Sequence, residues 1–174
     1  MKPIRIPLLA LSVLFAFATR GAVADEPAKL EDKIIGTWKL ISEEVEIQAT
    51  GEKAPALAAL GQSPAGYAIF TAEGRLMTVV TADGRNPPTT VQERAELLNN
   101  MVAYTGKYRL EGDKWITTVD VAWNPEWVGT EETRFFKIEG DRLEVVSQWR
   151  VMPNWPEKGM QRSRCRRGRS AHEG

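Results

Sequence analysis

The sequence contains one cysteine, Cys165, and one histidine, His172, among 174 residues. A single cysteine has no internal disulfide partner, so packing alone has to stabilise the fold. A single histidine near the C-terminus argues against a histidine-rich zinc site, a Ser-His-Asp triad and a Cys-His catalytic pair. We therefore predict no catalytic residues, no metal site and no cofactor.

Long hydrophobic runs are absent except near the N-terminus, where an apolar stretch covers residues 6–18. Lys2 and Arg5 precede this stretch and small residues follow it at positions 22–24, a pattern typical of a cleaved secretory signal peptide. The stretch is too short for a membrane anchor that stays in the chain. We expect cleavage after Ala24 and a periplasmic or secreted protein without an integral membrane segment.

An excess of charge of one sign is also absent, since the chain has 23 basic and 23 acidic residues. Residues 1–24 hold three basic residues and no acidic one, so the mature chain has 20 basic and 23 acidic residues. This mild acidity gives no electrostatic reason to expect nucleic acid as a partner. A mature length of about 150 residues suits one domain with its own core.

Two near-identical Glu-Gly-Asp corners, at residues 111–113 and 139–141, mark the second half of the chain. Each corner lies between stretches rich in β-branched and aromatic residues. In tight antiparallel connections, Gly supplies the positive φ and Asp binds its own backbone. The pattern predicts a β-meander of four strands, at residues 104–110, 114–123, 130–138 and 142–151.

The first half of the chain fits the same architecture, with strands expected at residues 34–47, 66–71 and 76–81. An eighth strand within residues 159–168 would close the sheet into a barrel, which hides its edges. The predicted fold is therefore all-β: an eight-stranded antiparallel up-and-down barrel with one amphipathic helix between strands 3 and 4.

The helix is predicted from a capping box, Thr90 with Glu93, and from apolar residues at helical spacing between Val91 and Val102. We expect its apolar stripe to plug one end of the barrel. A mobile lid over the barrel is the alternative.

The domain is expected to cover residues 25–160, and residues 161–174 are expected to form a basic tail or an irregular last strand. Five arginines fall within residues 161–169, which is a poor composition for a barrel strand. A basic tail that binds an acidic partner is a further interpretation.

Several short motifs can be compared with known families. They are Gly36-Thr37-Trp38-x-Leu40, Ser63-Pro64-x-Gly66-Tyr67, Gly74-Arg75-Leu76-Met77, Tyr104-x-Gly106-x-Tyr108, Asn124-Pro125-x-Trp127-x-Gly129-Thr130, Arg134-Phe135-Phe136 and Gly140-Asp141-Arg142-Leu143. Over about residues 33–152 the sequence resembles the bacterial lipocalin-like domain family, which has a lipocalin-type β-barrel. The resemblance implies a barrel with a central cavity, and it implies no reaction, because a fold does not fix a function.

The sequence departs from that family at two places. Many relatives carry histidines on the strand that here reads Ile116-Thr117-Thr118-Val119, and they tend to end in an apolar strand where this chain is rich in arginine. In lipocalins an arginine of the last strand stacks on the tryptophan that corresponds to Trp38. Arg162 or Arg164 is the candidate for that contact here.

Four of the six tryptophans fall between residues 123 and 155, namely Trp123, Trp127, Trp149 and Trp155. If the loop at Asn124 and the segment after Val151 meet at one end of the barrel, these rings would surround a cavity mouth. Large amphipathic rings suit a ligand with an apolar body and a polar group. Ordinary core and loop packing is the alternative.

Strand alternation nominates the side chains that line the interior. If Trp38 points inward, so do Leu40, Ser42 and Glu44; Glu132, Arg134 and Phe136 share a face of their own strand. The predicted ligand-binding residues are Glu44, Tyr104, Tyr108, Trp123, Trp127, Arg134, Phe136 and Trp149.

Arg134 and Glu44 are the charged exceptions on this wall, and a charge inside a barrel is costly unless it is paired or used. One interpretation is a structural ion pair, or an outward position after a β-bulge shifts the register. The other is an anchor in which Arg134 binds a carboxylate or enolate oxygen while Tyr104 or Tyr108 donates a hydrogen bond.

The predicted function is binding of a small hydrophobic or amphipathic molecule in the barrel cavity by an exported protein. The alternative is an isomerase, cyclase or hydratase that acts on a hydrophobic substrate, with Glu44 or Asp120 as base and Arg134 or a tyrosine as oxyanion partner. A packed barrel with a structural or interaction role is a third interpretation. The lack of a nucleophile motif favours binding over catalysis.

Overall fold

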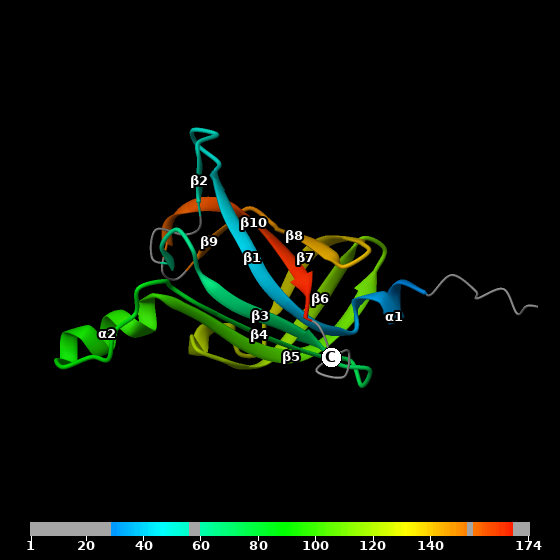
Figure 1. The fold of residues 1–174 in the computed structure, drawn as a ribbon, viewed down its shortest axis with the longest axis horizontal. Helices are drawn as coiled ribbons and strands as arrows, with labels where there is room; N and C mark the ends of the chain where they lie inside the picture. Colours follow the sequence, from blue (N-terminus) through cyan, green and yellow to red (C-terminus); the bar gives the residue numbers. More distant parts are fainter. Residues whose placement is uncertain (1–28, 56–59, 153–154, 169–174) are drawn as a thin grey trace, which may run out of the picture.

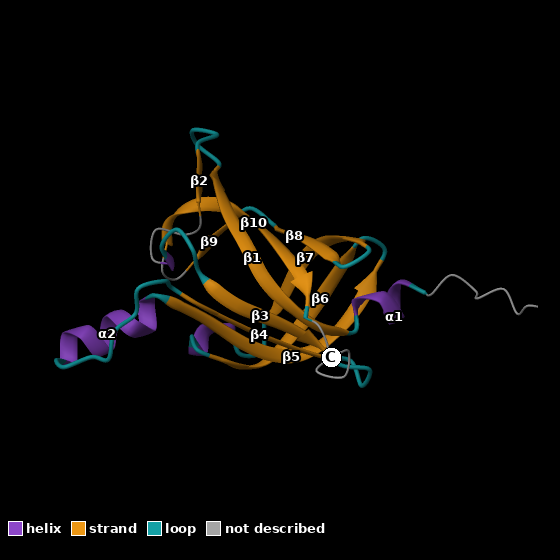
Figure 2. Cartoon of the chain, viewed as in Figure 1, coloured by secondary structure: helices purple, strands orange, loops and turns teal. Residues whose placement is uncertain are grey.

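Eight antiparallel strands form a closed barrel, as the alternating sequence pattern predicts (Figures 1 and 2). The computed structural model describes residues 29–55, 60–152 and 155–168. The barrel strands are β1 (Gly36–Ile47), β3 (Ala65–Phe70), β4 (Arg75–Thr81), β5 (Met101–Glu111), β6 (Lys114–Ala122), β7 (Glu131–Glu139), β8 (Arg142–Ser147) and β10 (Trp155–Arg167). Each pairs with the next in that order, and β10 pairs with β1 to close the cycle.

Shorter elements flank the barrel: α1 (Leu30–Ile34), β2 (Lys53–Pro55), α2 (Val91–Asn99), the 3₁₀ turn η2 (Pro125–Trp127) and β9 (Arg150–Met152). Strand β2 pairs with β1, and β9 pairs with β10, so both extend the sheet outside the closed cycle. Among the described residues no helix is long and apolar enough to cross a bilayer. The predicted signal peptide and His172 lie outside the described residues.

The two Glu-Gly-Asp corners make the hairpins that the sequence predicts. Gly112 connects β5 to β6 with a φ of +63°, and Gly140 connects β7 to β8 with a φ of +59°. Side chains with a Cβ rarely adopt this left-handed backbone, which explains why glycine stands at both corners. The predicted four-strand meander is confirmed as β5 to β8.

A β-bulge in β1 changes which carboxylate points inward. The pairing of β1 with β10 shifts register between Leu40 and Ser42, so Ile41 is an extra residue on the β1 side. Trp38 and Leu40 are buried as expected, but beyond the bulge the buried residues are Glu43, Val45 and Ile47. The predicted inward positions of Ser42 and Glu44 are therefore wrong, because a one-residue bulge exchanges the two faces of a strand.

The arginine-rich segment is a regular barrel strand. Residues 161–167 form the C-terminal part of β10, which pairs with both β8 and β1. Three arginines point outward in alternation, and two of them meet acids of the β8 region: Arg162 binds Glu144, and Nε of Arg166 lies 3.5 Å from Asp141. The inward side carries the small residues Ser163 and Cys165. The expectation of a poor strand fails because Arg162, Arg164 and Arg166 occupy a single, largely solvated face.

Helix α2 begins at the predicted capping box, in which Thr90 accepts from the backbone N–H of Glu93 at 3.1 Å. It does not plug the barrel, since none of its residues is buried and it projects away from the strands (Figure 1). The predicted stripe is incomplete because Val102 belongs to β5, where it pairs with Val80 and is buried in the barrel wall. The plug prediction is wrong, and the helix does not cover the barrel as a lid either.

One end of the barrel is closed around Trp38. Its indole Nε1–H donates to the carbonyl of Ile34 in α1 at 2.7 Å, and the Arg167 guanidinium lies 4.2 Å from the centre of its ring. Arg167 also donates to the carbonyl oxygens of Ile35 and Lys33, which satisfies backbone acceptors after the short helix. The predicted stacking of a last-strand arginine is present, but the residue is Arg167 and not Arg162 or Arg164.

Candidate functional site

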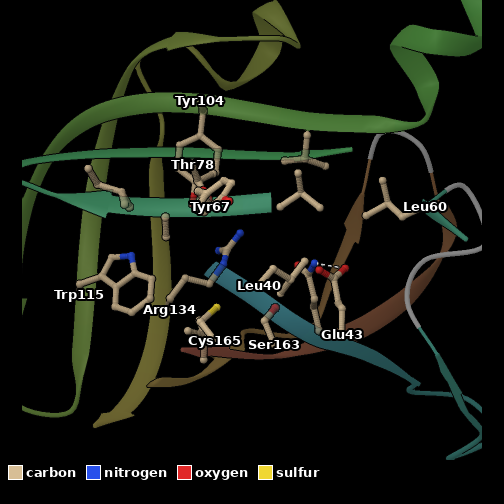
Figure 3. A pocket seen from close by; sticks show the side chains of 16 residues that line it. Leu40, Glu43, Leu60, Tyr67, Thr78, Tyr104, Trp115, Arg134, Ser163 and Cys165 are labelled. Carbon is tan, nitrogen blue, oxygen red and sulfur yellow. Dashed lines mark hydrogen bonds between the residues drawn. The ribbon is translucent and has the colours of Figure 1, made fainter. Parts of the chain in front are cut away.

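The barrel interior contains a partly open cavity of about 80 Å³ (Figure 3). Its wall is mostly apolar, with Leu40, Leu76, Val80, Val102 and Val145 contributed by four different strands. The volume is about half that of an engineered apolar cavity of about 150 Å³ that admits benzene. Polar groups also face this space: Glu43, Tyr104, Trp115, Arg134, Gln161, Ser163 and Cys165.

A buried ion-pair cluster lies beside the cavity on β7. Glu132 and Arg134 alternate with exposed neighbours and both point inward, with exposed fractions of 4% and 7%. Nη1 of Arg134 donates to Oε2 of Glu132 at 3.0 Å and to the carbonyl of Thr133 at 2.9 Å. Arg150 approaches Glu132 from β9 and donates to both carboxylate oxygens. Glu132 thus lies between two guanidinium groups, which compensates for its desolvation.

The electrostatics of Glu132 follow from this arrangement. Burial alone would raise the pKa of this carboxyl, but the Arg150 hydrogen bonds and the charges of Arg134 and Arg150 outweigh burial and hold the pKa below its ordinary value. The Arg150 guanidinium also lies 4.6 Å from the centre of the Trp127 ring. The loop that holds η2 and the start of β9 therefore meet at this cluster. Whether the segment after Val151 joins them, as the tryptophan distribution suggested, stays a prediction.

Glu43 is a second buried carboxyl, and no cation contacts it among the described residues. Its exposed fraction is 5%, and its hydrogen bond comes from the side-chain amide of Gln161 on β10 (dashed in Figure 3). Burial raises the pKa of Glu43 to about 7, while the Gln161 hydrogen bond and the more distant charge of Arg134 act in the opposite direction. Glu43 therefore changes charge near neutral pH.

Trp115 has a buried indole N–H without a partner among the described residues. Its ring is 97% buried and packs against Phe70 and Phe136, with centroid distances of 5.1 and 5.3 Å. A buried donor that is left unsatisfied costs about 1–3 kcal/mol. Trp115 lines the cavity, and Figure 3 shows it next to Arg134 among the lining side chains.

Two further titratable groups face the cavity and stay neutral at ordinary pH. Burial raises the pKa of the Tyr104 phenol, which interacts electrostatically with Arg134, Glu132 and Arg150. Burial, together with the charge of Glu43, raises the pKa of the Cys165 thiol to about 12. A thiol with such a pKa is a poor nucleophile and a poor metal ligand. No group of three or more metal-ligating side chains occurs in the part of the chain that the structure describes.

The structure separates the predicted site residues into three groups. Arg134 and Tyr104 line the cavity, and Trp127 contacts Tyr104 at 5.5 Å and Trp123 at 4.7 Å between ring centroids. Phe136 and Tyr108 belong to the aromatic core, where the Tyr108 ring packs on Phe70 at 5.1 Å.

Glu44 and Trp149 form the third group, which is not among the cavity-lining residues. Glu44 lies on the outer face of β1, 3.9 Å from Lys53, and Trp149 is half-buried between β8 and β9. The side chain of Trp155 lies outside the described ones.

Neither carboxylate proposed as a catalytic base faces the cavity. Asp120 lies on the outer face of β6 and forms an ion pair with Arg75 at 2.9 Å. Glu44 points outward beyond the bulge, so the inward carboxylate of that pair of glutamates is Glu43.

The site residues that the sequence analysis missed are Glu43, Trp115, Arg150 and Gln161. Trp115 could have been found from alternation, because it stands two residues before Thr117 and four before Val119 on the buried face of β6. Glu43 and Gln161 become neighbours only through the bulge and the closure of β1 on β10. No local sequence signal reports either event.

Comparisons with known proteins give a family model and similar solved structures. The family model, described as a lipocalin-like domain, matches residues 35–169. One of the solved structures is an uncharacterized protein from Bacteroides eggerthii, with a TM-score of 0.39 and 10% sequence identity, and the match covers 77% of this chain and 98% of that one. No curated protein matches the sequence.

Proposed function

Because the chain belongs to the lipocalin-like domain family, we propose that its barrel binds a small, largely apolar or amphipathic molecule in the interior cavity. The observation that carries this proposal is the space of about 80 Å³ in the barrel interior, which has a mostly apolar wall and one cation, Arg134, among its described lining residues. Barrels of eight strands are just wide enough to fill with side chains or to hold one small ligand. Because the side chains leave part of the interior unfilled, the barrel suits a small ligand better than a fully packed core.

Arg134 is the anchor for the polar part of the ligand. Both hydrogen bonds that it makes with described residues use Nη1. A guanidinium has five N–H donors, so donors on Nη2 and Nε are left for a ligand. The Tyr104 hydroxyl lies in the same electrostatic environment and can donate a second hydrogen bond. A ligand with an apolar body and one acceptor group suits this wall.

The test is direct detection of a ligand and of the space. Native mass spectrometry of the chain purified from its own host should reveal a co-purifying small molecule, and xenon should enter the cavity of the emptied protein. The variant Val102→Phe places a ring in the cavity and should abolish both signals while the fold, followed by circular dichroism, is retained. A barrel that excludes xenon and carries no molecule would leave only a structural or interaction role.

The same proposal includes export. Lys2 and Arg5 before the apolar stretch at residues 6–18 support it, with cleavage after Ala24. Expression of the full chain in a bacterial host with fractionation should then give a periplasmic or secreted product whose N-terminal residue is Asp25. An intact N-terminus in the cytoplasmic fraction would contradict export and would leave the binding proposal standing.

A second candidate function is proton transfer in the same cavity. The observation that favours it is the pKa of about 7 for Glu43, since a general base works best with a pKa near the working pH. Arg134 would stabilise the enolate oxygen of a small ketone while Glu43 takes the α-proton and later returns one. Exchange of the α-hydrogens of cyclopentanone in D₂O, followed by NMR, tests this reaction. A rate unaffected by Glu43→Gln would exclude Glu43 as the base.

A further inference from the structure

We propose that the ligand of the cavity is a short-chain carboxylate, held by Arg134 and the indole N–H of Trp115, and that Glu43 takes up a proton when the carboxylate binds. This inference rests on the proposed function, since it names the chemical class of the ligand for the same cavity.

The first argument is the position of two hydrogen-bond donors. Trp115 on β6 and Arg134 on β7 are direct cross-strand partners, and both side chains point into the barrel. Directly opposed residues on one face of an antiparallel pair have Cβ atoms about 4.5–5.5 Å apart. The two side chains therefore start from neighbouring positions of the barrel wall, and Figure 3 shows them next to each other at the cavity.

The second argument is that the Trp115 N–H lacks a hydrogen-bond acceptor among the described residues. The Trp115 N–H has no acceptor among the described residues, although the ring is 97% buried. Trp38, which is fully buried at the closed end of the barrel, by contrast donates to a backbone carbonyl at 2.7 Å. A carboxylate has two oxygens, so one can accept from Arg134 and the other from Trp115. An amide or an alcohol offers a single oxygen and no charge for the guanidinium.

The third argument is the balance of charges beside the cavity. The positive charges of Arg134 and of the partly exposed Arg150 flank the single negative charge of Glu132. Glu43 faces the same cavity, and no cation contacts it among the described residues. When Glu43 is neutral, this cluster has one more positive than negative charge, and an anionic ligand at Arg134 would balance it.

The charge of a bound ligand should change the pKa of Glu43, because few other charged groups face this carboxyl. Among the described residues, the charged or titratable groups that face it are Arg134 of β7 and Cys165 of β10, with the neutral Gln161 and Ser163 beside them on β10. Tyr104 of β5 lines the same cavity. A second carboxylate in this space would raise the pKa of Glu43 further from its value of about 7. Binding is then coupled to proton uptake, and affinity falls as the pH rises above neutrality.

The cavity volume sets the length of the ligand. A space of about 80 Å³ is smaller than the pockets of about 300–1,000 Å³ that hold drug-sized ligands. A carboxylate with a hydrocarbon tail of a few carbons is the matching size, and the tail would lie against Leu40, Leu76 and Val102. Butyrate is a suitable probe, and butyramide is its neutral control of nearly the same shape.

The experiment compares these two probes by calorimetric titration at pH 6. Butyrate should bind at least about tenfold more tightly than butyramide, which corresponds to about 1.4 kcal/mol. Arg134→Met and Trp115→Phe should each remove most of this preference. Arg134→Lys keeps the positive charge but loses the planar set of N–H donors, so it should retain part of the preference for butyrate. The melting temperature of each variant verifies that the fold is intact.

The failure of this inference can be told apart from failure of the proposed function. Equal binding of butyrate and butyramide, or entry of xenon without binding of either probe, overturns the carboxylate and leaves a cavity that binds neutral molecules. Exclusion of xenon as well as both probes overturns both proposals. A preference for butyrate that survives Trp115→Phe and Arg134→Met also overturns the assignment, because the charge recognition would then lie elsewhere.

The pH dependence tests the role of Glu43. Butyrate stays ionised between pH 6 and pH 8, so its own titration does not intervene. Affinity should fall by about tenfold for each pH unit once the pH exceeds the pKa of free Glu43, and Glu43→Gln should remove this dependence. Glu44→Gln is the matched control and should behave as the unmodified chain. Equal affinity at pH 6 and pH 8 in the unmodified chain overturns the proton uptake.

Discussion

Two buried tryptophans, Trp38 and Trp115, differ in whether the indole N–H has a hydrogen-bond acceptor. At the closed end, the N–H of Trp38 meets the carbonyl of Ile34, and Arg167 covers the ring while it binds two further carbonyls. At the cavity, Trp115 has no acceptor among the described residues, and Arg134 opposite it is tied to Glu132 through one nitrogen. At the closed end the chain itself supplies the acceptor for the indole N–H. At the cavity the N–H of Trp115 is left without one among the described residues, and we place the ligand there.

Among the substitutions that test this comparison, Glu132→Gln should cause the largest loss in the free energy of unfolding. Loss of the carboxylate leaves Arg134 and Arg150 buried or half-buried without an anion, and breaking a buried pair in this way costs about 3–5 kcal/mol. The free energy of unfolding from urea titration measures the effect. Glu144→Gln is the control, because the Glu144–Arg162 pair lies on the partly exposed outer face and such pairs are worth about 0–1 kcal/mol. If both variants lost the same free energy of unfolding, the ion pairs of Glu132 would not be buried ones.

The next largest effect should come from Glu43→Gln, and it should depend on pH. The folded pKa of about 7 lies above the ordinary value of 4.5, so the folded state keeps a proton that the unfolded state releases between these values. The free energy of unfolding therefore loses about 3 kcal/mol as the pH rises through this window. Glutamine removes that loss, so the variant should be more stable than the unmodified chain at pH 8 and equal to it below pH 4.

Glu44→Gln is the control for this comparison, since only the bulge distinguishes the two neighbouring glutamates. It should change the free energy of unfolding by less than about 0.5 kcal/mol at either pH, as substitutions at exposed positions usually do. Reversed results for the two variants would mean that the strand has no bulge at Ile41.

Arg167→Ala should weaken the closed end without affecting ligand binding. The variant loses the stacking on Trp38 and two hydrogen bonds to carbonyl oxygens, and a cost of about 2 kcal/mol is expected from contacts of this kind. Thermal unfolding measures the loss, with Arg166→Ala, an exposed position on the same strand, as control. A parallel loss of butyrate affinity would show that the two ends are not independent.

The smallest effect should come from α2. Leu98 is 52% exposed and has no core contact, so Leu98→Ser should change the free energy of unfolding by less than about 0.5 kcal/mol. Calorimetry of the two proteins at equal concentration measures this difference. A loss of several kcal/mol would mean that the helix docks on a surface of the barrel or on a second chain.

The sequence predicts the features of this fold that local chemistry decides. The Glu-Gly-Asp corners, the capping box at Thr90 and the alternation that turns Arg134 and Tyr104 inward each depend on a few neighbouring residues. The regular spacing of Arg162, Arg164 and Arg166 also contained the signal for a strand, since every second position leaves Ser163 and Cys165 on the other face. The high arginine content of residues 161–169 drew attention away from this two-residue alternation.

The features that the sequence did not predict depend on distant contacts. The bulge at Ile41 decides between Glu43 and Glu44, two identical side chains, so composition cannot distinguish them. Helix α2 has a correct start signal, but whether its apolar residues find a surface depends on the barrel end, which other residues close. The pairing of Glu43 with Gln161 joins residues 118 positions apart in the chain.

The junction of β1 with β10 has a consequence for the order of assembly. The first barrel strand, β1, pairs with residues 159–167, which are synthesised more than 100 residues later. Until β10 has been made, β1 and β8 each present a free edge, and such edges recruit other chains into aggregates. Truncation before Gly159 should therefore yield an insoluble product rather than a smaller barrel, and closure of the barrel is expected only after β10 has been made.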